Sequence, residues 1–504
     1  MPGPESSEPE APRGAARHTA VILVLLGATG LHALAFLNLP LIPKNDSVWY
    51  LGLSHGLAAE RIFDPYALGA PTSFDIHYTI GYPLFLDLVR WLVGWQHLAL
   101  GVLVAQHLAG IATVWLVWRL GVELGRPGAG TLAAAAYALS FPALYYSQLM
   151  ISETLFTSLA LTAAVLLVRW FSGPSTTRLV ACGALLGLAS LVRPIAVVEL
   201  AAFAAFVVLH TGLGSLRTGA RRLAILASPT VLMLGLALAH NHVTYGRASL
   251  SDATGRHLID RVWAFDGEVA SDAPHTRQVL DFCRASGQRF RIPGLWWDSY
   301  KALRYGSGTT AREADDLLRS AAWESIRARP WSYLAKTPVA AWHVLSDADT
   351  WPPALEQTLS PAAFERYLTI WTRAPAERRA VSRSSRAIEG RRELRRRMPI
   401  SSPEGGPQQR WWLVFWRDHS PRYGTGMAVA ALVGALVLLR FGRRPDWVPV
   451  LVFLALVLPA AFLEYPYPRY RQPAIPAMLV VIASAAWEAL RRIRPRARAA
   501  AAGP

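Results

Sequence analysis

Long apolar runs, separated by short polar segments, dominate the chain. A helix needs about 20 mostly apolar residues to cross a bilayer. Runs near this length, several of them shorter, occur at 19–37, 100–118, 129–147, 154–171, 179–192, 195–210, 223–241, 427–440, 447–463 and 473–490. We therefore expect an all-α polytopic membrane protein with about ten transmembrane helices. A further apolar stretch, 82–97, contains Asp87, Arg90 and Gln96, and we predict an interfacial or re-entrant helix there.

The composition agrees with many membrane spans and excludes other classes. Of 504 residues, 53% are hydrophobic and 17% are charged, against about 25% charged in a soluble domain. The mean hydropathy is +0.26. Disordered, collagen-like and disulfide-scaffold proteins do not have this composition. Cys182 lies in an apolar run and Cys283 in a polar region, so we expect no disulfide between them, and no metal-type Cys/His spacing is present.

The first apolar run has two interpretations. It follows Arg13 and Arg17, and Ala33-Leu34-Ala35 has the small-residue pattern of a signal-peptide cleavage site. The run is longer than the usual apolar core of a signal peptide, about 7–15 residues. We therefore favour an uncleaved membrane anchor.

The placement of Lys and Arg predicts the orientation of the spans. Short cytoplasmic loops carry an excess of these residues, whereas long loops are excluded from the rule. If the N-terminus is cytoplasmic, most of the Lys and Arg residues in the short segments between spans are also cytoplasmic. The short outside segments hold only Lys44, Arg61, Arg90, Arg193, Arg469 and Arg471. We expect both termini to be cytoplasmic in the cell membrane, with 38–99 (the first outer loop), 148–153 and 243–426 outside.

Residues 243–426 are too long to be a simple connection. Amphipathic patterning at 309–345 and many tryptophans predict a small, mainly helical extracytoplasmic domain over 250–370. Trp411, Trp412 and Trp416 indicate an interfacial belt before the span at 427. The domain organisation we expect is an N-terminal transmembrane catalytic module at 19–242, the domain at 243–426 and C-terminal spans at 427–490.

Three segments outside these units are rich in charged or small residues. Residues 378–397 contain many arginines among Ser and Gly, and we interpret them as a mobile, solvated segment or as a patch for anionic lipid or glycan. Nucleic acid is not expected as a partner, because this segment faces outward. Residues 1–18 and 495–504 are rich in Pro, Ala and Gly and are expected to be disordered. We expect 1–18 and the basic segment 491–504 to be cytoplasmic tails.

Two acidic residues are expected on the outer face although they are distant in sequence. Asp46 follows the first span by about nine residues, and Glu153 begins the fourth. Each alone also fits an ordinary role, Asp46 as a loop acid and Glu153 in a helix first turn after Ser152. Ionisable residues at membrane spans are costly and usually functional. We therefore predict that Asp46 and Glu153 form a carboxylate pair.

Cations expected on the same face complete a candidate site. Arg193 lies between the fifth and sixth spans, and Arg469 and Arg471 precede the last. A guanidinium binds phosphate oxygens through two parallel donors, so these side chains suit a lipid phosphate; snorkelling, or pairing with Glu464, is the alternative. Glu199 is expected to pair with an arginine. His240 and His242, two residues apart, do not share a helix face and make a weak metal site.

The order of several motifs resembles that of a known family. The motifs are Asp46 with Tyr50 one turn later, Gly81-Tyr82-Pro83-Leu84-Phe85, Ser152-Glu153-Thr154-Leu155-Phe156, Gly187 to Pro194, Asn241 with Gly246, and Arg469-Tyr470-Arg471-Gln472-Pro473. This order resembles the GT-C fold glycosyltransferases that use polyprenyl-phosphate sugars, including relatives of the protein O-mannosyltransferases and the lipid A aminoarabinose transferase. The resemblance covers 19–250 and 427–490 but not 250–420.

The resemblance implies transfer of a sugar from a polyprenyl-phosphate donor to an extracytoplasmic glycan, lipid or protein acceptor. Asp46 is then the general base and Glu153 positions the acceptor, the base or a cation. Arg469, Arg471 and Arg193, or a divalent cation, stabilise the departing lipid phosphate. The candidate substrate contacts are Tyr50, His77, Tyr82 and Tyr470. No cofactor is required by this chemistry, and metal use stays open.

Two other functions are compatible with many spans and buried charges. A transporter or flippase of a lipid-linked sugar would often show two related halves, but no internal repeat is evident and the charged candidates share one face. A non-catalytic membrane scaffold would leave the two acids unexplained. We therefore predict a membrane glycosyltransferase.

Overall fold

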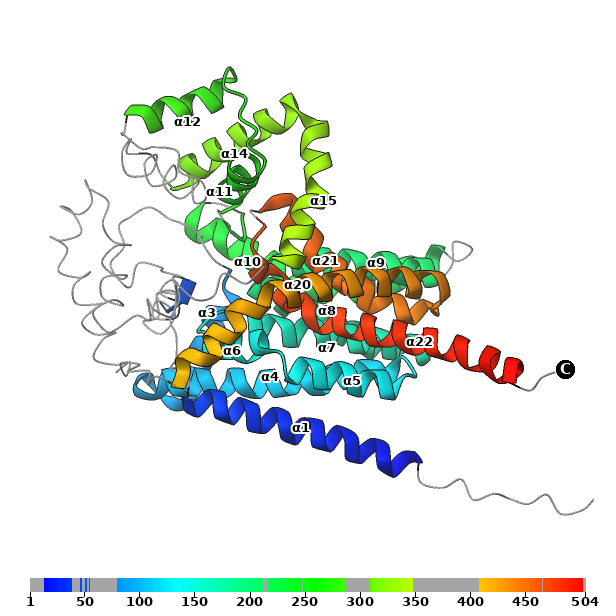
Figure 1. Cartoon of the computed structure of the whole chain (residues 1–504). Helices are drawn as coiled ribbons and strands as arrows, with labels where there is room; N and C mark the ends of the chain where they lie inside the picture. The colour runs from blue at the N-terminus through cyan, green and yellow to red at the C-terminus, as the bar shows by residue number, and fades with distance from the viewer. Residues whose placement is uncertain are drawn as a thin grey trace, which may run out of the picture.

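The computed structural model describes residues 13–38, 46–47, 50–51, 54, 79–211, 216–246, 248–251, 253–285, 309, 311–347, 408–464 and 466–501. These residues form helices and short connections without a strand, as Figure 1 shows. The all-α class expected from the sequence is confirmed. His77 and the Arg-rich segment 378–397 lie outside the described residues, and so do the side chains of Trp411, Trp412 and Trp416.

Most helices run side by side in one bundle (Figure 1). Its members are α1 (Arg13–Asn38), α4 (Leu98–Glu123), α5 (Pro127–Ala138), α6 (Phe141–Gln148), α7 (Glu153–Ser172), α8 (Thr176–Val192), α9 (Ala196–Thr211), α10 (Leu216–Tyr245), α20 (Gln408–Phe441), α21 (Trp447–Leu463) and α22 (Ile475–Ala501). Among the described residues, seven helical stretches are long and apolar enough to cross a membrane, and α8 and α9 are shorter apolar helices. The chain is therefore a multi-pass membrane protein, and the described residues do not confirm the expected count of about ten spans.

Several helix boundaries differ from the sequence prediction. The expected span 129–147 is two helices, α5 and α6, because the backbone leaves the helical conformation at Ser140, directly before Phe141-Pro142. At the two chain ends, α1 begins at Arg13, inside the expected tail, and α22 continues to Ala501. The segment 495–504, which was expected to be disordered, is thus helical up to Ala501, because Ala and Arg are strong helix formers. Similarly, α20 begins at Gln408 rather than near 427.

The segment predicted as an interfacial or re-entrant helix is α3 (Gly81–Val93), followed by the 3-10 helix η1 (Trp95–His97). With 13 residues, α3 is too short to cross a bilayer. It packs against α4 and α8. A Cβ at Gly81 would lie 2.5 Å from the carbonyl carbon of Leu191, so only glycine permits this approach of α3 to the end of α8.

A smaller helical unit sits at one end of the bundle. It consists of α11 (Thr254–Ile259), the π-helix η3 (Asp260–Phe265), α12 (Pro274–Ala285), α14 (Ala311–Ala328) and α15 (Pro330–Ser346). Its own core contains Val262, Trp263, Leu318, Ala322 and Tyr333. The amphipathic pattern at 309–345 accounts for α14 and α15. We refer to this unit as the head domain, and to the bundle end that carries it as the head end (Figure 1).

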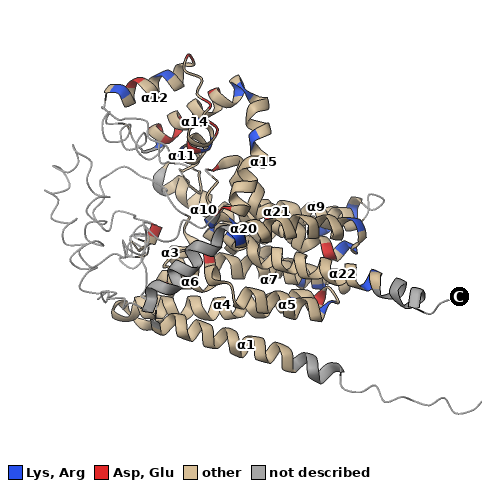
Figure 2. Cartoon of the chain, viewed as in Figure 1, with Lys and Arg blue, Asp and Glu red and all other residues tan. Residues whose placement is uncertain are grey.

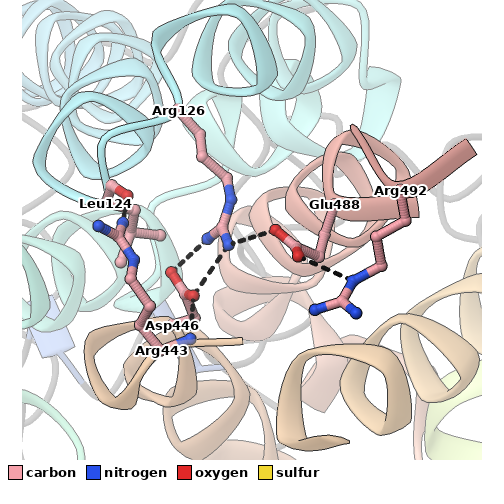
Figure 3. Close-up of polar contacts among 6 residues, drawn as sticks. All are labelled: Leu124, Arg126, Arg443, Asp446, Glu488 and Arg492. Carbon is pink, nitrogen blue, oxygen red and sulfur yellow. Dashed lines mark hydrogen bonds and ion pairs between the residues drawn. The ribbon is translucent and has the colours of Figure 1, made fainter. Parts of the chain in front are cut away.

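Charged residues are scarce along the bundle helices and gather at their ends and in the head domain (Figure 2). At the end opposite the head domain, Arg126 is 3% exposed and its Nη1 and Nη2 both contact the carboxylate of the fully buried Asp446. Arg126 also reaches Glu488 on α22, at 3.4 Å, and the Arg443 guanidinium donates to the Leu124 carbonyl (Figure 3). This charged cluster joins the α4–α5 turn to α22 and to the 3-10 turn η4 (Arg444–Asp446).

Candidate active site

The segment after α1 is attached to the residues that precede α7. The Ser47 hydroxyl donates to the Met150 carbonyl at 2.7 Å, and the Tyr50 hydroxyl donates to the Ser152 hydroxyl at 3.3 Å. These two bonds place Asp46 beside the N-terminus of α7, where Glu153 is the first helical residue. The sequence prediction that Asp46 and Glu153 lie at the same end of the spans agrees with this geometry.

Two arginines link the two carboxylates. Arg469 Nη2 lies 2.9 Å from Asp46 Oδ2, and Arg469 Nε lies 3.5 Å from Glu153 Oε1. Arg193 Nη1 lies 2.8 Å from the same Glu153 oxygen. Asp46, Arg469, Glu153 and Arg193 thus form a row of alternating charges from four distant parts of the chain, which we call the charge row. Arg469 pairs with Asp46 rather than with Glu464.

Exposure differs strongly along the charge row. The Glu153 side chain is 2% exposed, that of Asp46 14% and that of Arg193 17%, whereas that of Arg469 is 40% exposed. Glu153 is therefore a buried counter-ion, and Arg469 is the member that an incoming anion reaches most easily. A buried carboxylate requires compensation by paired charges, which the two arginines supply.

Aromatic side chains enclose the charge row. The Arg193 guanidinium carbon lies 6.0 Å from the Phe156 ring centroid and 5.9 Å from that of Tyr470, and Arg469 lies 5.8 Å from Tyr470. Tyr470 therefore lies against both arginines, at distances typical of cation–π contacts. Burial first, and then the nearby carboxylates of Asp46 and Glu153, raise the pKa of Tyr50 above its ordinary value. Tyr50 consequently stays protonated and keeps its bond to Ser152.

Gln106, which the sequence analysis did not single out, supports this arrangement from α4. Its Oε1 accepts the Tyr82 hydroxyl at 2.6 Å, and its Nε2 donates to the carbonyls of Ser147 and Leu149 at 3.0 and 2.7 Å. Gln106 is 1% exposed. It holds the non-helical turn that leads into Glu153. The available signal was a glutamine in the middle of an otherwise apolar predicted span.

Two expected substrate-site residues have structural contacts instead. Tyr82 is fully buried with its hydroxyl committed to Gln106, and its ring packs edge-on against Tyr50 at 4.7 Å between centroids. Arg471 is fully buried, and its Nη1 donates to the carbonyls of Leu345 and Asp347 at 2.7 and 2.8 Å. Arg471 thus contacts the C-terminal end of α15, whereas Arg469 contacts Asp46 and Glu153 of the charge row.

The remaining candidates do not join the charge row. Glu199, in the first turn of α9, is fully buried, and none of the described residues gives its carboxylate a hydrogen bond, so the expected arginine partner is not found there. Glu464 lies 3.7 Å from His257 of the head domain. Among the described residues, no group of three or more His, Cys, Asp or Glu side chains is arranged to hold a metal ion.

Comparison with known proteins gives a family match over part of the chain. Residues 79–239 match the family model of dolichyl-phosphate-mannose-protein mannosyltransferases. No curated protein matches the chain. Among solved structures, the oligosaccharyltransferase of Archaeoglobus fulgidus tethered to an acceptor peptide is 12% identical, with a TM-score of 0.48 over 94% of this chain and 49% of that one. The chain spans about half the length of that enzyme.

A second solved structure is ArnT from Cupriavidus metallidurans bound to undecaprenyl phosphate. It is 14% identical, with a TM-score of 0.33 over 94% of this chain and 78% of that one. The family match includes Glu153 and Arg193, two of the four members of the charge row. Over residues 79–239, the family model thus confirms the resemblance to GT-C glycosyltransferases that the order of the sequence motifs predicted.

Proposed function

We propose that this protein is a membrane glycosyltransferase that moves a sugar from a polyprenyl-phosphate donor to a hydroxyl or amine of an extracytoplasmic glycan, lipid or protein. The observation that carries the proposal is the charge row at the head end of the bundle. It combines a base, two guanidinium groups and a buried counter-ion at the level where the spans end. Family similarity over residues 79–239 supports the same reaction class.

The donor phosphate binds Arg469, with Arg193 as the second cation. Arg469 is the most exposed member of the row, and its guanidinium is suited to two phosphate oxygens. Arg193 is fixed between Phe156, Tyr470 and Glu153 and contributes positive charge without moving. Arg471 is not assigned to the donor, because its guanidinium holds two carbonyls of the α15 terminus.

Asp46 acts as the general base. The acceptor oxygen or nitrogen attacks the anomeric carbon of the sugar, and the bond between that carbon and the phosphate oxygen breaks. The leaving polyprenyl phosphate takes the bonding electron pair, and the acceptor proton passes to Asp46. Arg469 and Arg193 stabilise the charge on the leaving phosphate, and such electrostatic and acid–base contributions are commonly worth about 10²–10⁴-fold each. Glu153 keeps both arginines in place.

The head end faces the outside of the cell membrane in this proposal, and both termini are cytoplasmic. The helix ends and connections at the opposite end are rich in arginine, as expected for the cytoplasmic side. They contain Arg119, Arg126, Arg169, Arg178, Arg217, Arg221, Arg222, Arg440, Arg443 and Arg444. The donor lipid then presents its phosphate and sugar on the outer leaflet, where no nucleotide is required.

A transfer assay with the full-length protein tests the proposal. Protein in vesicles receives a radiolabelled polyprenyl-phosphate sugar together with cell-envelope lipids and glycans, and the label should appear in an acceptor fraction. Asp46→Asn should lower the rate of transfer by about 10²–10⁴-fold. Asp87→Asn is the matched control, because Asp87 lies on α3 in a partly exposed pair with Arg90 at 2.7 Å.

Two outcomes contradict the proposal. Normal turnover by Asp46→Asn removes Asp46 from the reaction. Movement of the intact labelled lipid across the vesicle bilayer, without transfer of its sugar, assigns the protein to lipid-linked sugar transport instead.

A further inference from the structure

Helix α15 exposes a face that contains only apolar side chains. After Pro330 at its start, the exposed residues of this helix are Trp331, Leu334, Ala335, Pro338, Val339 and Trp342. Their spacing of three or four residues places them on one side over three turns. Trp331 is 79% exposed, Leu334 47%, Val339 49% and Trp342 37%. Such a continuous apolar surface marks a contact with a lipid or protein partner rather than with water.

The other side of α15 is already occupied by protein. Tyr333 belongs to the head-domain core, and Val344 and Leu345 belong to the core of the bundle. Thr337 and Ala340, between them, are also buried. The helix is therefore amphipathic in an unusual sense, because its protein-facing side includes Tyr333 and Thr337 while its most exposed face is apolar. Lys336 and His343, whose side chains are 37% and 40% exposed, lie beside this face and pair with Glu268 and Asp347.

Both ends of α15 are fixed at the depth where the membrane spans end. Near its start, the Tyr333 hydroxyl donates to the carbonyl of Phe462, one residue before the end of α21. At its end, the Leu345 carbonyl accepts from Arg471, which lies in the 3-10 helix η5 (Pro468–Ala474) directly before α22. The Ser346 carbonyl lies 2.7 Å from the position of a Cβ on Gly424, near the start of the span at Arg422.

These contacts orient the helix. The 13 residue-to-residue steps from Tyr333 to Ser346 cover about 20 Å at 1.5 Å per residue, yet both ends meet the head ends of spanning helices. The axis of α15 therefore runs along the membrane surface and across the direction of α20 and α21, as in Figure 1.

We propose that α15 is an interfacial helix whose apolar face is inserted among the lipids of the head-end leaflet, at the boundary between headgroups and acyl chains. The apolar face is continuous with lipid-facing residues of the bundle, because Leu458, Phe462 and Leu463 at the head end of α21 are 40%, 36% and 46% exposed. Tryptophans near both ends of the face, Trp331 and Trp342, are typical anchors at this boundary. The head domain is thereby held at a fixed height above the bilayer, independently of any catalytic role.

Site-directed spin labelling of the full chain tests this placement. Cys182 and Cys283, both free and buried, are first replaced by Ala. Single cysteines are then introduced as Leu334→Cys or Val339→Cys and labelled with a nitroxide. Because both positions are exposed, the label should not disturb the fold. Gln278→Cys is the control, since Gln278 is an exposed polar residue on α12 of the same domain.

Collision rates are measured in vesicles of phosphatidylcholine and phosphatidylglycerol. Labels at 334 and 339 should collide with oxygen, which partitions into lipid, several-fold more than with a water-soluble nickel chelate. The label at 278 should show the reverse preference. Preferential collision of the 334 and 339 labels with the nickel chelate overturns the proposal. Protection of both labels from both reagents also overturns it, and spin–spin broadening would then identify a second copy of the chain as the cover.

Discussion

If Arg469 binds the donor phosphate as proposed, Asp46 competes with that phosphate for the same guanidinium. This competition leads to an unusual expectation for Asp46→Asn. In the structure, Asp46 Oδ2 lies 2.9 Å from Arg469 Nη2. A phosphate that binds Arg469 must displace or weaken this contact. Removing the carboxylate charge should therefore improve donor binding while it removes the general base. Substitution of a catalytic carboxylate is not usually expected to strengthen substrate binding while it lowers turnover.

The size of the binding gain follows from the exposure of the pair. Coulomb's law at about 4 Å gives roughly 4 kcal/mol at an effective dielectric constant of about 20. The Arg469 side chain is 40% exposed, so solvent reduces the net value to about 1 kcal/mol, the upper range for exposed pairs. At about 1.4 kcal/mol per factor of ten, Asp46→Asn should bind the donor about fivefold more tightly. Turnover should fall by about 10²–10⁴-fold, the usual contribution of a general base.

Equilibrium binding of a fluorescent polyprenyl phosphate to the protein in vesicles measures the first effect, and transfer of labelled sugar measures the second. In Arg469→Ala, the added Asp46→Asn substitution should bring no further gain in affinity, because the two groups act through one contact. Asp87→Asn should leave both quantities unchanged. Weaker donor binding by Asp46→Asn would refute the competition, since it would mean that the carboxylate itself helps to hold the donor.

Three other predictions follow from contacts away from the phosphate. Arg126→Ala should lower the free energy of unfolding by about 3–5 kcal/mol, because it leaves the buried Asp446 charge without compensation. Thermal unfolding should show this loss, and the double variant Arg126→Met with Asp446→Leu should recover much of it. Unchanged stability of Arg126→Ala would contradict this account of the cluster in Figure 3. Gln106→Leu should lower kcat at least tenfold with a smaller change in KM, because it releases the turn before Glu153; equal loss in kcat and binding would count against a positioning role. Hydrogen bonds from Lys336 and Ser332 lower the pKa of Glu268 from 4.5 to about 2. The contribution of Glu268 to stability is therefore complete above about pH 4.5 and is lost as the pH falls towards 2. The stability difference between wild type and Glu268→Gln should shrink over that range, and a constant difference would argue against the ion pair between Lys336 and Glu268.

Much of the site was predictable because a membrane restricts where polar groups can lie. Once the Lys and Arg distribution had ordered the spans, Asp46, Glu153, Arg193 and Arg469 fell at the same end, whatever their sequence separation. The requirement that each span cross the bilayer therefore predicted which residues, distant in sequence, lie at the same end of the bundle. The specific pairing, with Arg469 between the two acids, depends on side-chain geometry and was not predictable in this way.

Other features depend on local or tertiary detail that periodicity does not carry. The predicted span 129–147 is mostly apolar, yet the extended backbone at Ser140, two residues before Pro142, divides it into α5 and α6. Tyr82 is of a residue type that often contacts sugars, and the sequence therefore favoured a substrate contact. Its burial and its hydrogen bond to Gln106 depend on the packing of α3 on α4, which the sequence pattern does not predict. Glu199 was expected to find an arginine because an unpaired buried carboxylate is costly. The neighbours of the Glu199 carboxylate depend on how the helices pack, which the sequence pattern does not predict.

The difference between Arg469 and Arg471 connects the two proposals. Both residues lie in the 3-10 helix η5 (Pro468–Ala474), which has about three residues per turn, so side chains two positions apart point to different sides. Arg469 therefore reaches Asp46 and Glu153, while Arg471 reaches the end of α15. Tyr470, between them, lies against the Arg193 and Arg469 guanidinium groups. One short 3-10 helix thus links the guanidinium that we propose for donor binding to the helix that we propose for the lipid interface. If both proposals hold, the contacts that set the height of the head domain also set the height of the phosphate site above the bilayer core.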